Sequence, residues 1–177
     1  MKSLLNTKIE TTRLLLVPIA LRYKKDIFNE LTREITVYME IEPSKDLKET
    51  QEFIDKSIKG IKRGNNLQLV ILEKISKEFL GCIGLHKLDK DTPEMGIWIK
   101  KSAFGYKYGQ EAMKALKQWA DENSEYEYIT YSAAEKNIAS RKIAEMLGGK
   151  IERKYNKKIK SGKEYFCYVY RIYSNKK

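Results

Sequence analysis

The sequence predicts one α/β domain that spans residues 1–177. A chain of 177 residues is long enough for one compact domain and too short for two of ordinary size. Its residues are 42% hydrophobic and 33% charged, which is the balance of a globular protein with a heavily charged surface. Strand-like and helix-like segments alternate along it without internal repeats or a linker, and a strand–loop–helix–strand–helix unit lies at its centre.

The N-terminal third begins with one strand and continues with two helices. The strand is expected in "TTRLLLVPI", residues 11–19, and a helical stretch follows around residues 22–33. A longer helix is expected in residues 45–64, where it ends at Gly60 or Gly64. The apolar residues that the spacing places on one face of it are Leu47, Phe53, Ile54, Ile58 and Ile61.

Three strands are expected next, joined as consecutive antiparallel hairpins. The strand-like runs are "LQLVILEK" (67–74), "FLGCIGLHKL" (79–88) and "EMGIWIK" (94–100). The links between them, "ISKE" and "DKDTP", are polar and turn-like, so a hairpin is the simplest connection.

Helices and strands alternate in the rest of the chain. Apolar residues fall on one helical face of "GQEAMKALKQWADEN" (109–123), and the strand "EYITYSA" (127–133) follows. A short helix is expected in "NIASRKIAEMLGG" (137–149), with Asn137 as its N-cap. The end of the chain, residues 150–173, reads as two strands around the turn "KSGK".

The formal net charge of +11 favours anionic partners such as nucleotides, nucleic acids, anionic membranes or acidic proteins. Much of this charge is spread lysine, and the densest cluster, residues 152–163, is expected to be an exposed hairpin. Direct nucleic-acid binding is not expected, because no RNP-like motif, zinc knuckle or helix-turn-helix accompanies the charge. The chain has neither a membrane-spanning apolar run nor a signal-peptide pattern, so a cytoplasmic protein without a membrane partner is expected.

Cys82, Cys167 and His86 are the only cysteines and the only histidine in the chain. Two distant cysteines without flanking ligands form no zinc pattern, so no metal is expected. Their apolar surroundings predict buried free thiols rather than a disulfide. A Ser–His–Asp or Cys–His site would rest on His86 alone, and His86 is expected to be a structural or surface side chain of its strand.

A glycine-bearing loop, "AFGYKYGQEAM" (103–113), joins a predicted strand to a predicted helix. Free backbone N–H groups and the dipole at a helix N-terminus favour an anion, and Lys107 adds positive charge. The loop matches neither the P-loop nor the G-x-G-x-x-G motif. Spacing alone leaves a phosphate site and a plain strand–helix turn equally open.

"EMGIWIKKSAFGYKYGQEAM", followed by "NIASRKIAEMLGG", resembles the GNAT superfamily of acyl-CoA-dependent N-acetyltransferases. The start, "IETTRLLLVPI", resembles the opening strand of its RimJ/RimL-like group, which acetylates the N-termini of ribosomal proteins. These segments occur in the family's order between Ile9 and Ile172. The resemblance implies a mixed, largely antiparallel sheet of about six to seven strands flanked by helices. Two of the strands would splay apart to form an acetyl-CoA cleft.

The resemblance implies that acetyl-CoA (coenzyme A) is the cofactor and indicates which residues bind it. The family's pyrophosphate-loop pattern, Q/R-x-x-G-x-G/A, spans Phe104 to Gly109 and puts Lys107 where a glycine is expected. Lys107 must then adopt the backbone conformation of that glycine, and its ammonium is placed to compensate by reaching a phosphate. The implied cofactor-binding residues are Ile97, Trp98, Ile99, Phe104, Gly105, Tyr106, Lys107, Tyr108, Gly109, Gln110, Asn137 and Ser140.

The resemblance also implies two residues that carry the reaction. Glu94 matches a glutamate that takes the proton of the amine, directly or through water; its alternative is a surface glutamate after a turn. Ser140 matches a serine that stabilises the departing thiolate; its alternative is a first-turn serine that helps to cap its helix. Ala144 stands where many members have a tyrosine acid, and Gly149 where an aromatic residue normally packs near the cofactor.

The expected function is acetyl-CoA-dependent transfer of an acetyl group to a primary amine by direct attack in a ternary complex. The amine belongs to a protein N-terminus, ribosomal or other, or to a small molecule, and a homodimer is compatible with the sequence. Residues 22–64 and the C-terminal hairpin would select the acceptor, with Glu40 and Glu42 near the expected pocket. The departures from the family pattern leave an alternative: a catalytically weakened GNAT-fold domain that binds acyl-CoA as a sensor or docks a partner.

Overall fold

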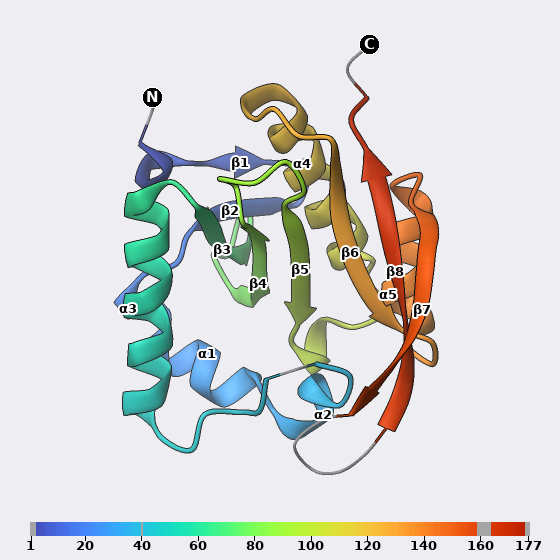
Figure 1. Ribbon diagram of the computed structural model, residues 1–177. Coiled ribbons are helices and arrows are strands. Elements are labelled where there is room, and N and C mark those ends of the chain that lie inside the picture. The colour runs from blue at the N-terminus through green and yellow to red at the C-terminus, as the bar shows by residue number, and fades with distance from the viewer. Residues whose placement is uncertain (1–2, 40, 159–163, 176–177) are drawn as a thin grey trace.

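An eight-stranded sheet in the order β1-β2-β3-β4-β5-β6-β8-β7 runs through the protein (Figure 1). The computed structural model describes residues 3–39, 41–158 and 164–175. Neighbouring strands are antiparallel except for β5 and β6, which are parallel, so the expected mixed, largely antiparallel α/β sheet is confirmed. The strands are β1 (Ile9–Glu10), β2 (Leu14–Pro18), β3 (Asn66–Glu73), β4 (Phe79–His86), β5 (Glu94–Ile99), β6 (Tyr128–Ala134), β7 (Lys150–Lys158) and β8 (Glu164–Tyr173).

The expected count of six to seven strands is too low by the short edge strand β1. Its two residues pair with β2 through Ile9↔Leu16 and Glu10↔Leu15. Two residues are too few to show the alternation of buried and exposed side chains that marks a strand in a sequence. The seven longer strands all lie in segments where strands were expected, and the turn expected at residues 160–163 lies outside the described residues.

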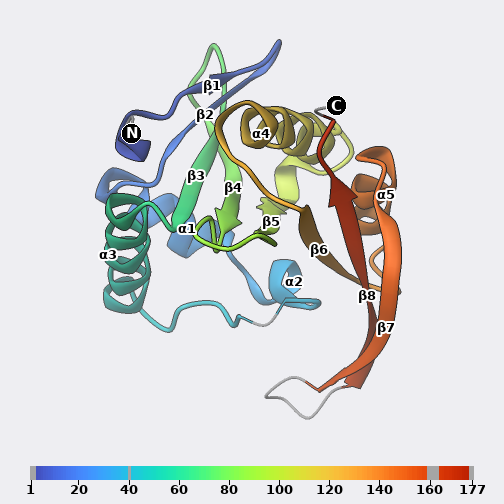
Figure 2. The ribbon, with the colours of Figure 1, turned by 45° about the horizontal axis from the view of Figure 1, so that its top comes forward.

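The helices α1 (Lys24–Glu30) and α3 (Leu47–Arg63) cover one face of the sheet (Figures 1 and 2). The Asp46 side chain caps α3 by accepting a 2.8 Å hydrogen bond from the Glu49 N–H, and Gly64 ends the helix at a φ of 76°. Of the two predicted ends of this helix, Gly64 is therefore the correct one.

The helical stretch expected around residues 22–33 is present but is divided into separate pieces. The chain forms a 3₁₀ turn, then α1, and then the four-residue α2 (Arg33–Thr36). The break falls at Leu31 and Thr32, whose ψ values of 73° and 169° leave the helical region. The 3₁₀ turns of the protein are η1 (Leu4–Asn6), η2 (Leu21–Tyr23) and η3 (Lys101–Ala103).

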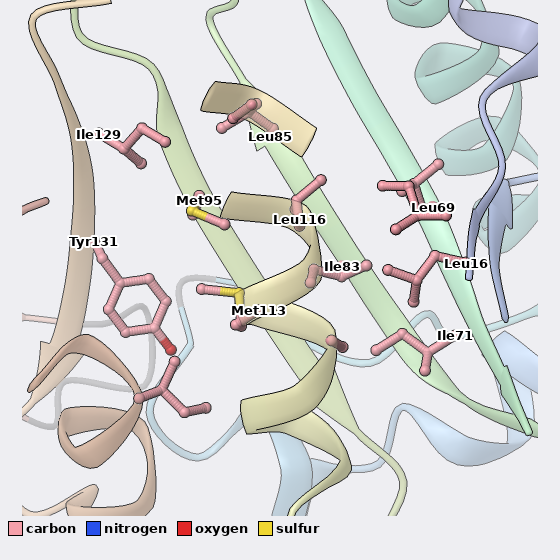
Figure 3. Close-up of a cluster of buried hydrophobic side chains, with 14 of the residues drawn as sticks. Leu16, Leu69, Ile71, Ile83, Leu85, Met95, Met113, Leu116, Ile129 and Tyr131 are labelled. Atoms are coloured by element: carbon pink, nitrogen blue, oxygen red, sulfur yellow. The ribbon is translucent and has the colours of Figure 1, made fainter. Parts of the chain in front are cut away.

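The helices α4 (Tyr108–Asn123) and α5 (Ile138–Met146) pack on the opposite face. Figure 3 shows Met113 and Leu116 of α4 facing apolar side chains of the sheet. The sheet residues labelled there are Leu16, Leu69, Ile71, Ile83, Leu85, Met95, Ile129 and Tyr131. Cys82 and Cys167 are buried thiols, as predicted.

Strands β5 and β6 separate after a short parallel contact. Their pairing consists of Glu94↔Thr130 and Met95↔Tyr131, and the strands then diverge toward their C-terminal ends (Figure 1). A pair of splayed strands in the middle of the sheet is therefore confirmed, and the split leaves the second half of β5 unpaired on its β6 side.

Candidate active site

The unpaired edge of β5 presents backbone N–H groups to the gap between β5 and β6. On the other edge, the Lys100 N–H donates to the Leu80 carbonyl of β4 at 2.8 Å. Because N–H groups alternate in direction along a strand, those of Ile97 and Ile99 point toward the gap. The Trp98 N–H points toward β4, and the buried Trp98 ring lies 5.7 Å from the Phe79 ring.

The first turn of α4 lies next to this part of β5. A β-carbon built at Gly109 would lie 3.6 Å from Ile99, 3.8 Å from Ile97 and 3.5 Å from Ile143 of α5. The end of β5, the start of α4 and the body of α5 therefore meet at Gly109. The fold brings together these three segments, which the sequence had connected only by family resemblance.

The loop before α4 contains two residues with a positive φ. Gly105 has a φ of 85°, and Lys107 has a φ of 63° and a ψ of 17°. The expectation that Lys107 adopts a glycine-like conformation is confirmed, at a cost of about 1–2 kcal/mol for a residue with a β-carbon.

Within the described residues, no side chain caps the N-terminus of α4. The first N–H groups of the helix, those of Tyr108, Gly109 and Gln110, thus project without an intrahelical acceptor. A β-carbon at Gly105 would meet nothing within 4 Å, so the space beside the loop is open. Free N–H groups, a helix dipole and open space fit the diphosphate of coenzyme A.

Glu111 in the first turn of α4 anchors this loop to the N-terminal segment. Its carboxylate accepts hydrogen bonds from the Thr11 hydroxyl at 2.5 Å, the Arg13 N–H at 3.0 Å and the Arg13 Nε at 2.7 Å. Burial alone would raise the pKa of Glu111, but the hydrogen bonds from Thr11 and Arg13 outweigh it and lower the pKa below its usual value. The Glu111 carboxylate is therefore held in its charged form.

Arg13 extends the same network to the aromatic residues of the loop. Its guanidinium donates to the Tyr106 carbonyl at 3.1 Å and lies 4.6 Å from the centre of the Tyr108 ring. The Tyr106 and Tyr108 rings stack 5.6 Å apart. Sequence reasoning missed Arg13 and Glu111, because 98 residues separate them and neither belongs to the glycine pattern. The Tyr106 side chain and that of Phe104 are exposed.

Ser140 lies in the first turn of α5, on the other side of the gap. The Asn137 side chain caps the helix by accepting a 3.1 Å hydrogen bond from the Ser140 N–H, which confirms its predicted role as N-cap. The Ser140 hydroxyl is 2.7 Å from the hydroxyl of Tyr131 on β6. Tyr131 is a second residue that sequence reasoning missed, although strand alternation places it on the helix-facing side with Ile129 and Ala133.

Ala144 on α5 and Gly149 after it are the two residues in this segment that differ from the family pattern, and the structure shows the surroundings of both. Ala144 is fully buried in the cluster that also contains Tyr131. A β-carbon at Gly149 would lie 2.7 Å from the Ala144 carbonyl oxygen, so the backbone leaves no room there for the aromatic residue of other members.

Glu94 lies at the N-terminal end of β5, where β6 is still paired. Its exposed carboxylate accepts a 2.6 Å hydrogen bond from the Lys87 ammonium. His86 of β4 is directly opposite Glu94 in the sheet, and its ring lies over Gly84. Burial lowers the pKa of His86, with Glu94 opposing and Lys87 adding to the shift, so the imidazole is neutral at neutral pH.

A pocket of about 380 Å³ lies between the segment after α2 and the β7–β8 pair. It is lined by Tyr38, Glu135, Lys136, Asn156, Glu164, Tyr165 and Phe166. Glu135 is tied to Lys154 at 2.6 Å and to the Tyr168 hydroxyl at 2.8 Å. Of the two acidic residues expected near the acceptor, Glu42 is exposed and Glu40 lies outside the described residues.

The part of the chain that the structure describes contains neither a cluster of metal ligands nor a membrane-spanning helix. No group of three or more His, Cys, Asp or Glu side chains there could hold a metal ion. No helix there has the length and apolar content needed to cross a bilayer.

Solved structures of several acetyltransferases resemble this fold. One from Bacillus anthracis, of the GNAT family, matches with a TM-score of 0.80 and 19% identity, over 94% of this chain and 98% of that one. One from Salmonella typhimurium, which modifies the N-terminal serine of 50S ribosomal subunit protein L7/L12, gives 0.82 and 15%, over 96% and 100%. The microcin C7 self-immunity acetyltransferase MccE, solved with acetyl-CoA and AMP, gives 0.81 and 18%, over 92% and 93%.

The family assignment comes from the sequence, because identities this low show the fold alone. No curated protein sequence matches the chain. The family model of the acetyltransferase (GNAT) domain matches residues 13–150, which is more than half of the chain. The protein therefore belongs to the GNAT family of acetyltransferases, whose acetyl donor is acetyl-CoA.

Proposed function

We propose that the protein is an N-acetyltransferase that moves an acetyl group from acetyl-CoA to a primary amine within a ternary complex. The observation that carries this proposal is the gap between β5 and β6. Free N–H groups of β5, the uncapped N-terminus of α4 and the Ser140 hydroxyl all lie around it.

The chain offers separate groups to the two ends of the cofactor. When bound, acetyl-CoA supplies an acetyl group activated as a thioester. The N-terminus of α4 and the Lys107 ammonium would hold its diphosphate, since both favour negative charge. The N–H groups of Ile97 and Ile99 would donate hydrogen bonds to the acetyl carbonyl oxygen and stabilise the negative charge that develops there.

Acetyl transfer to an amine forms one bond and breaks another. The amine nitrogen bonds to the acetyl carbon, and the carbon–sulfur bond breaks with its electron pair remaining on sulfur. Glu94 would take the proton that the amine loses, directly or through water. Ser140 would donate a hydrogen bond to the departing sulfur.

The acceptor is a protein N-terminal amine or a small-molecule amine. The Salmonella structure belongs to an enzyme that modifies a protein N-terminus, which supports the first class. The pocket beside the β7–β8 pair is lined by aromatic rings, whose faces suit a cationic amine, while its carboxylates, Glu135 and Glu164, are ion-paired with Lys154 and Lys158. The first observation supports the RimJ/RimL-like assignment, and the second suits an amine of either class.

A coenzyme A release assay with acetyl-CoA and a panel of amines and N-terminal peptides tests the proposal. Mass spectrometry would identify the acetylated product. Glu94→Gln is expected to lower turnover about 100-fold, the usual contribution of a general base, without changing acetyl-CoA affinity. Glu122→Gln on the exposed face of α4 is the matched control and should behave as the wild type.

The assay has distinct outcomes. Amine-dependent coenzyme A release with an acetylated product supports the enzyme, whereas acetyl-CoA binding without turnover on any acceptor supports the sensor alternative. Normal turnover by Glu94→Gln would remove Glu94 as the base and leave the enzyme assignment intact.

A further inference from the structure

We infer that Tyr131 is a positioning residue for the leaving group: its hydroxyl donates to Ser140 and so directs the Ser140 hydroxyl hydrogen toward the departing sulfur. This inference rests on the proposed function, because the sulfur belongs to coenzyme A. It assigns a role in the reaction to a strand residue that lies outside the motifs of the sequence.

Tyr131 reaches Ser140 from across the core. It lies on β6 with 4% of its surface exposed, in the apolar cluster between the sheet and α4. Figure 3 shows its ring beside Met113 with the hydroxyl pointing toward α5. The hydroxyl oxygen is 2.7 Å from Ser140 Oγ, a good distance for a hydrogen bond between hydroxyls.

If the residue at position 131 served packing alone, a tyrosine would be less favourable for stability than a phenylalanine. Burying a hydroxyl in apolar surroundings costs free energy unless it finds a partner, and phenylalanine would fill the same space without that cost. Ala144, one turn after Ser140 on the same face of α5, is small and fully buried. The face of the helix toward β6 is therefore open enough for the Tyr131 hydroxyl to reach its first turn.

The direction of the hydrogen bond follows from the two hydroxyls. The Tyr131 hydroxyl is the more acidic of the two and hence the better donor, while burial raises its pKa above the usual value and keeps it protonated. The Ser140 N–H is already bonded to Asn137. When Tyr131 donates to Ser140 Oγ, the single Ser140 hydroxyl hydrogen is free to donate elsewhere.

The free hydrogen of Ser140 lies at the N-terminus of α5, where the helix dipole also favours negative charge. A thiolate that leaves into the gap would gain both interactions. Tyr131 itself transfers no proton in this arrangement; it keeps Ser140 in the orientation that donates to sulfur. Phenylalanine at position 131 would let the Ser140 hydroxyl turn to other acceptors.

The test is the pH dependence of coenzyme A binding relative to desulfo-coenzyme A, which lacks the thiol. Calorimetric titrations between pH 7 and pH 10, the range around an ordinary thiol pKa, would compare the two ligands in each protein. The wild type is expected to bind coenzyme A increasingly more tightly than desulfo-coenzyme A as the thiol ionises. The gain should reach about tenfold, the usual effect of one hydrogen bond to a charged group.

Three variants and one control variant make the test specific. Ser140→Ala should lower the pH-dependent preference for coenzyme A to the part that the dipole of α5 supplies, and Tyr131→Phe should reduce it about threefold or more. Adding Tyr131→Phe to Ser140→Ala should change nothing further, because Tyr131 acts through Ser140. Tyr126→Phe, whose hydroxyl bonds to Asp121 at the far end of α4, is the matched control and should keep the wild-type preference.

The possible failures are distinguishable. Equal pH dependence in the wild type and Tyr131→Phe, or a loss in Tyr131→Phe that persists in the Ser140→Ala background, would overturn the inference and leave the proposed function standing. Absence of any coenzyme A binding would overturn both. Because each protein is compared with itself on two ligands, a change in stability does not imitate the expected result.

Discussion

Lys107 is one of three lysines, with Lys77 and Lys87, whose backbone lies in the left-handed region. Its φ of 63° belongs to the left-handed region that glycine enters without cost, yet the position carries a long charged side chain. An unfavourable conformation is retained at a functional site when the side chain contributes something else. Here the contribution would be an ammonium group next to the cofactor diphosphate.

Replacing Lys107 separates the strain of its backbone from the contribution of its ammonium group to cofactor binding. Lys107→Gly should raise the free energy of unfolding by about 0.5–1 kcal/mol, because the relieved strain exceeds the added entropy of glycine in the unfolded chain. It should also weaken acetyl-CoA binding about three- to tenfold, more at low salt than at high salt. Urea denaturation and calorimetry measure the two quantities.

The control for Lys107 is Lys107→Ala, which loses the ammonium but keeps the strain. It should bind acetyl-CoA as weakly as Lys107→Gly while gaining no stability. Wild-type affinity in both variants would show that the ammonium does not contact a phosphate.

His86 predicts a pH dependence of stability. Its pKa is lowered in the folded protein, mainly by burial, so the folded state binds fewer protons than the unfolded state near pH 6. Stability should thus be complete above the unfolded pKa of about 6.5 and fall as the pH drops below it. Since His86 is the only histidine, the difference between wild type and His86→Gln isolates this effect.

Thermal unfolding of both proteins between pH 8 and pH 5 checks the prediction for His86. The melting temperature of the wild type should fall more steeply on acidification than that of His86→Gln. Parallel curves would show that His86 is as solvated in the folded state as in the unfolded state.

The start of α4 is fixed by the network of Glu111 with Thr11 and Arg13. Glu111→Gln keeps the shape but loses the charge that holds Arg13, and should lower the free energy of unfolding by about 1–3 kcal/mol. Because Arg13 also holds the Tyr106 carbonyl, the loop should loosen and acetyl-CoA affinity should fall. Urea denaturation measures the free energy of unfolding, and calorimetry measures the affinity for acetyl-CoA. If Glu111→Gln lost stability but kept its affinity, the network would have a structural role only.

The helices and strands differ in how well their ends can be predicted from the sequence. Asn137 marks the start of α5 through local hydrogen bonding, so the sequence was sufficient there, whereas for the end of α3 it left Gly60 and Gly64 open and the fold decides for Gly64. The break between α1 and α2 lies at Leu31 and Thr32, where the local signal is a threonine that suits a helix N-cap but makes no capping hydrogen bond, and no glycine or proline marks the break.

In the candidate site, too, some features could be predicted from the sequence and others could not. The glycine-bearing loop and Ser140 follow from family patterns that are contiguous in the chain. The bond between Tyr131 and Ser140, and that between Arg13 and Glu111, depend on how the sheet and helices pack, and a sequence without its fold does not give them.

Across the molecule, the two layers of helices leave one opening in the sheet, where β5 and β6 diverge. On one of these faces the two diverging strands pack against different helices, since α4 contacts β5 while α5 contacts β6. The net charge of +11 of the whole chain favours association with an anionic cofactor.

A crystal structure of the protein saturated with acetyl-CoA tests this arrangement most directly. The thioester should lie between β5 and β6, with its carbonyl oxygen about 3 Å from the N–H of Ile97 or Ile99 and the diphosphate at the start of α4. Acetyl-CoA bound elsewhere, or an empty gap at a concentration that saturates binding in solution, would contradict the account.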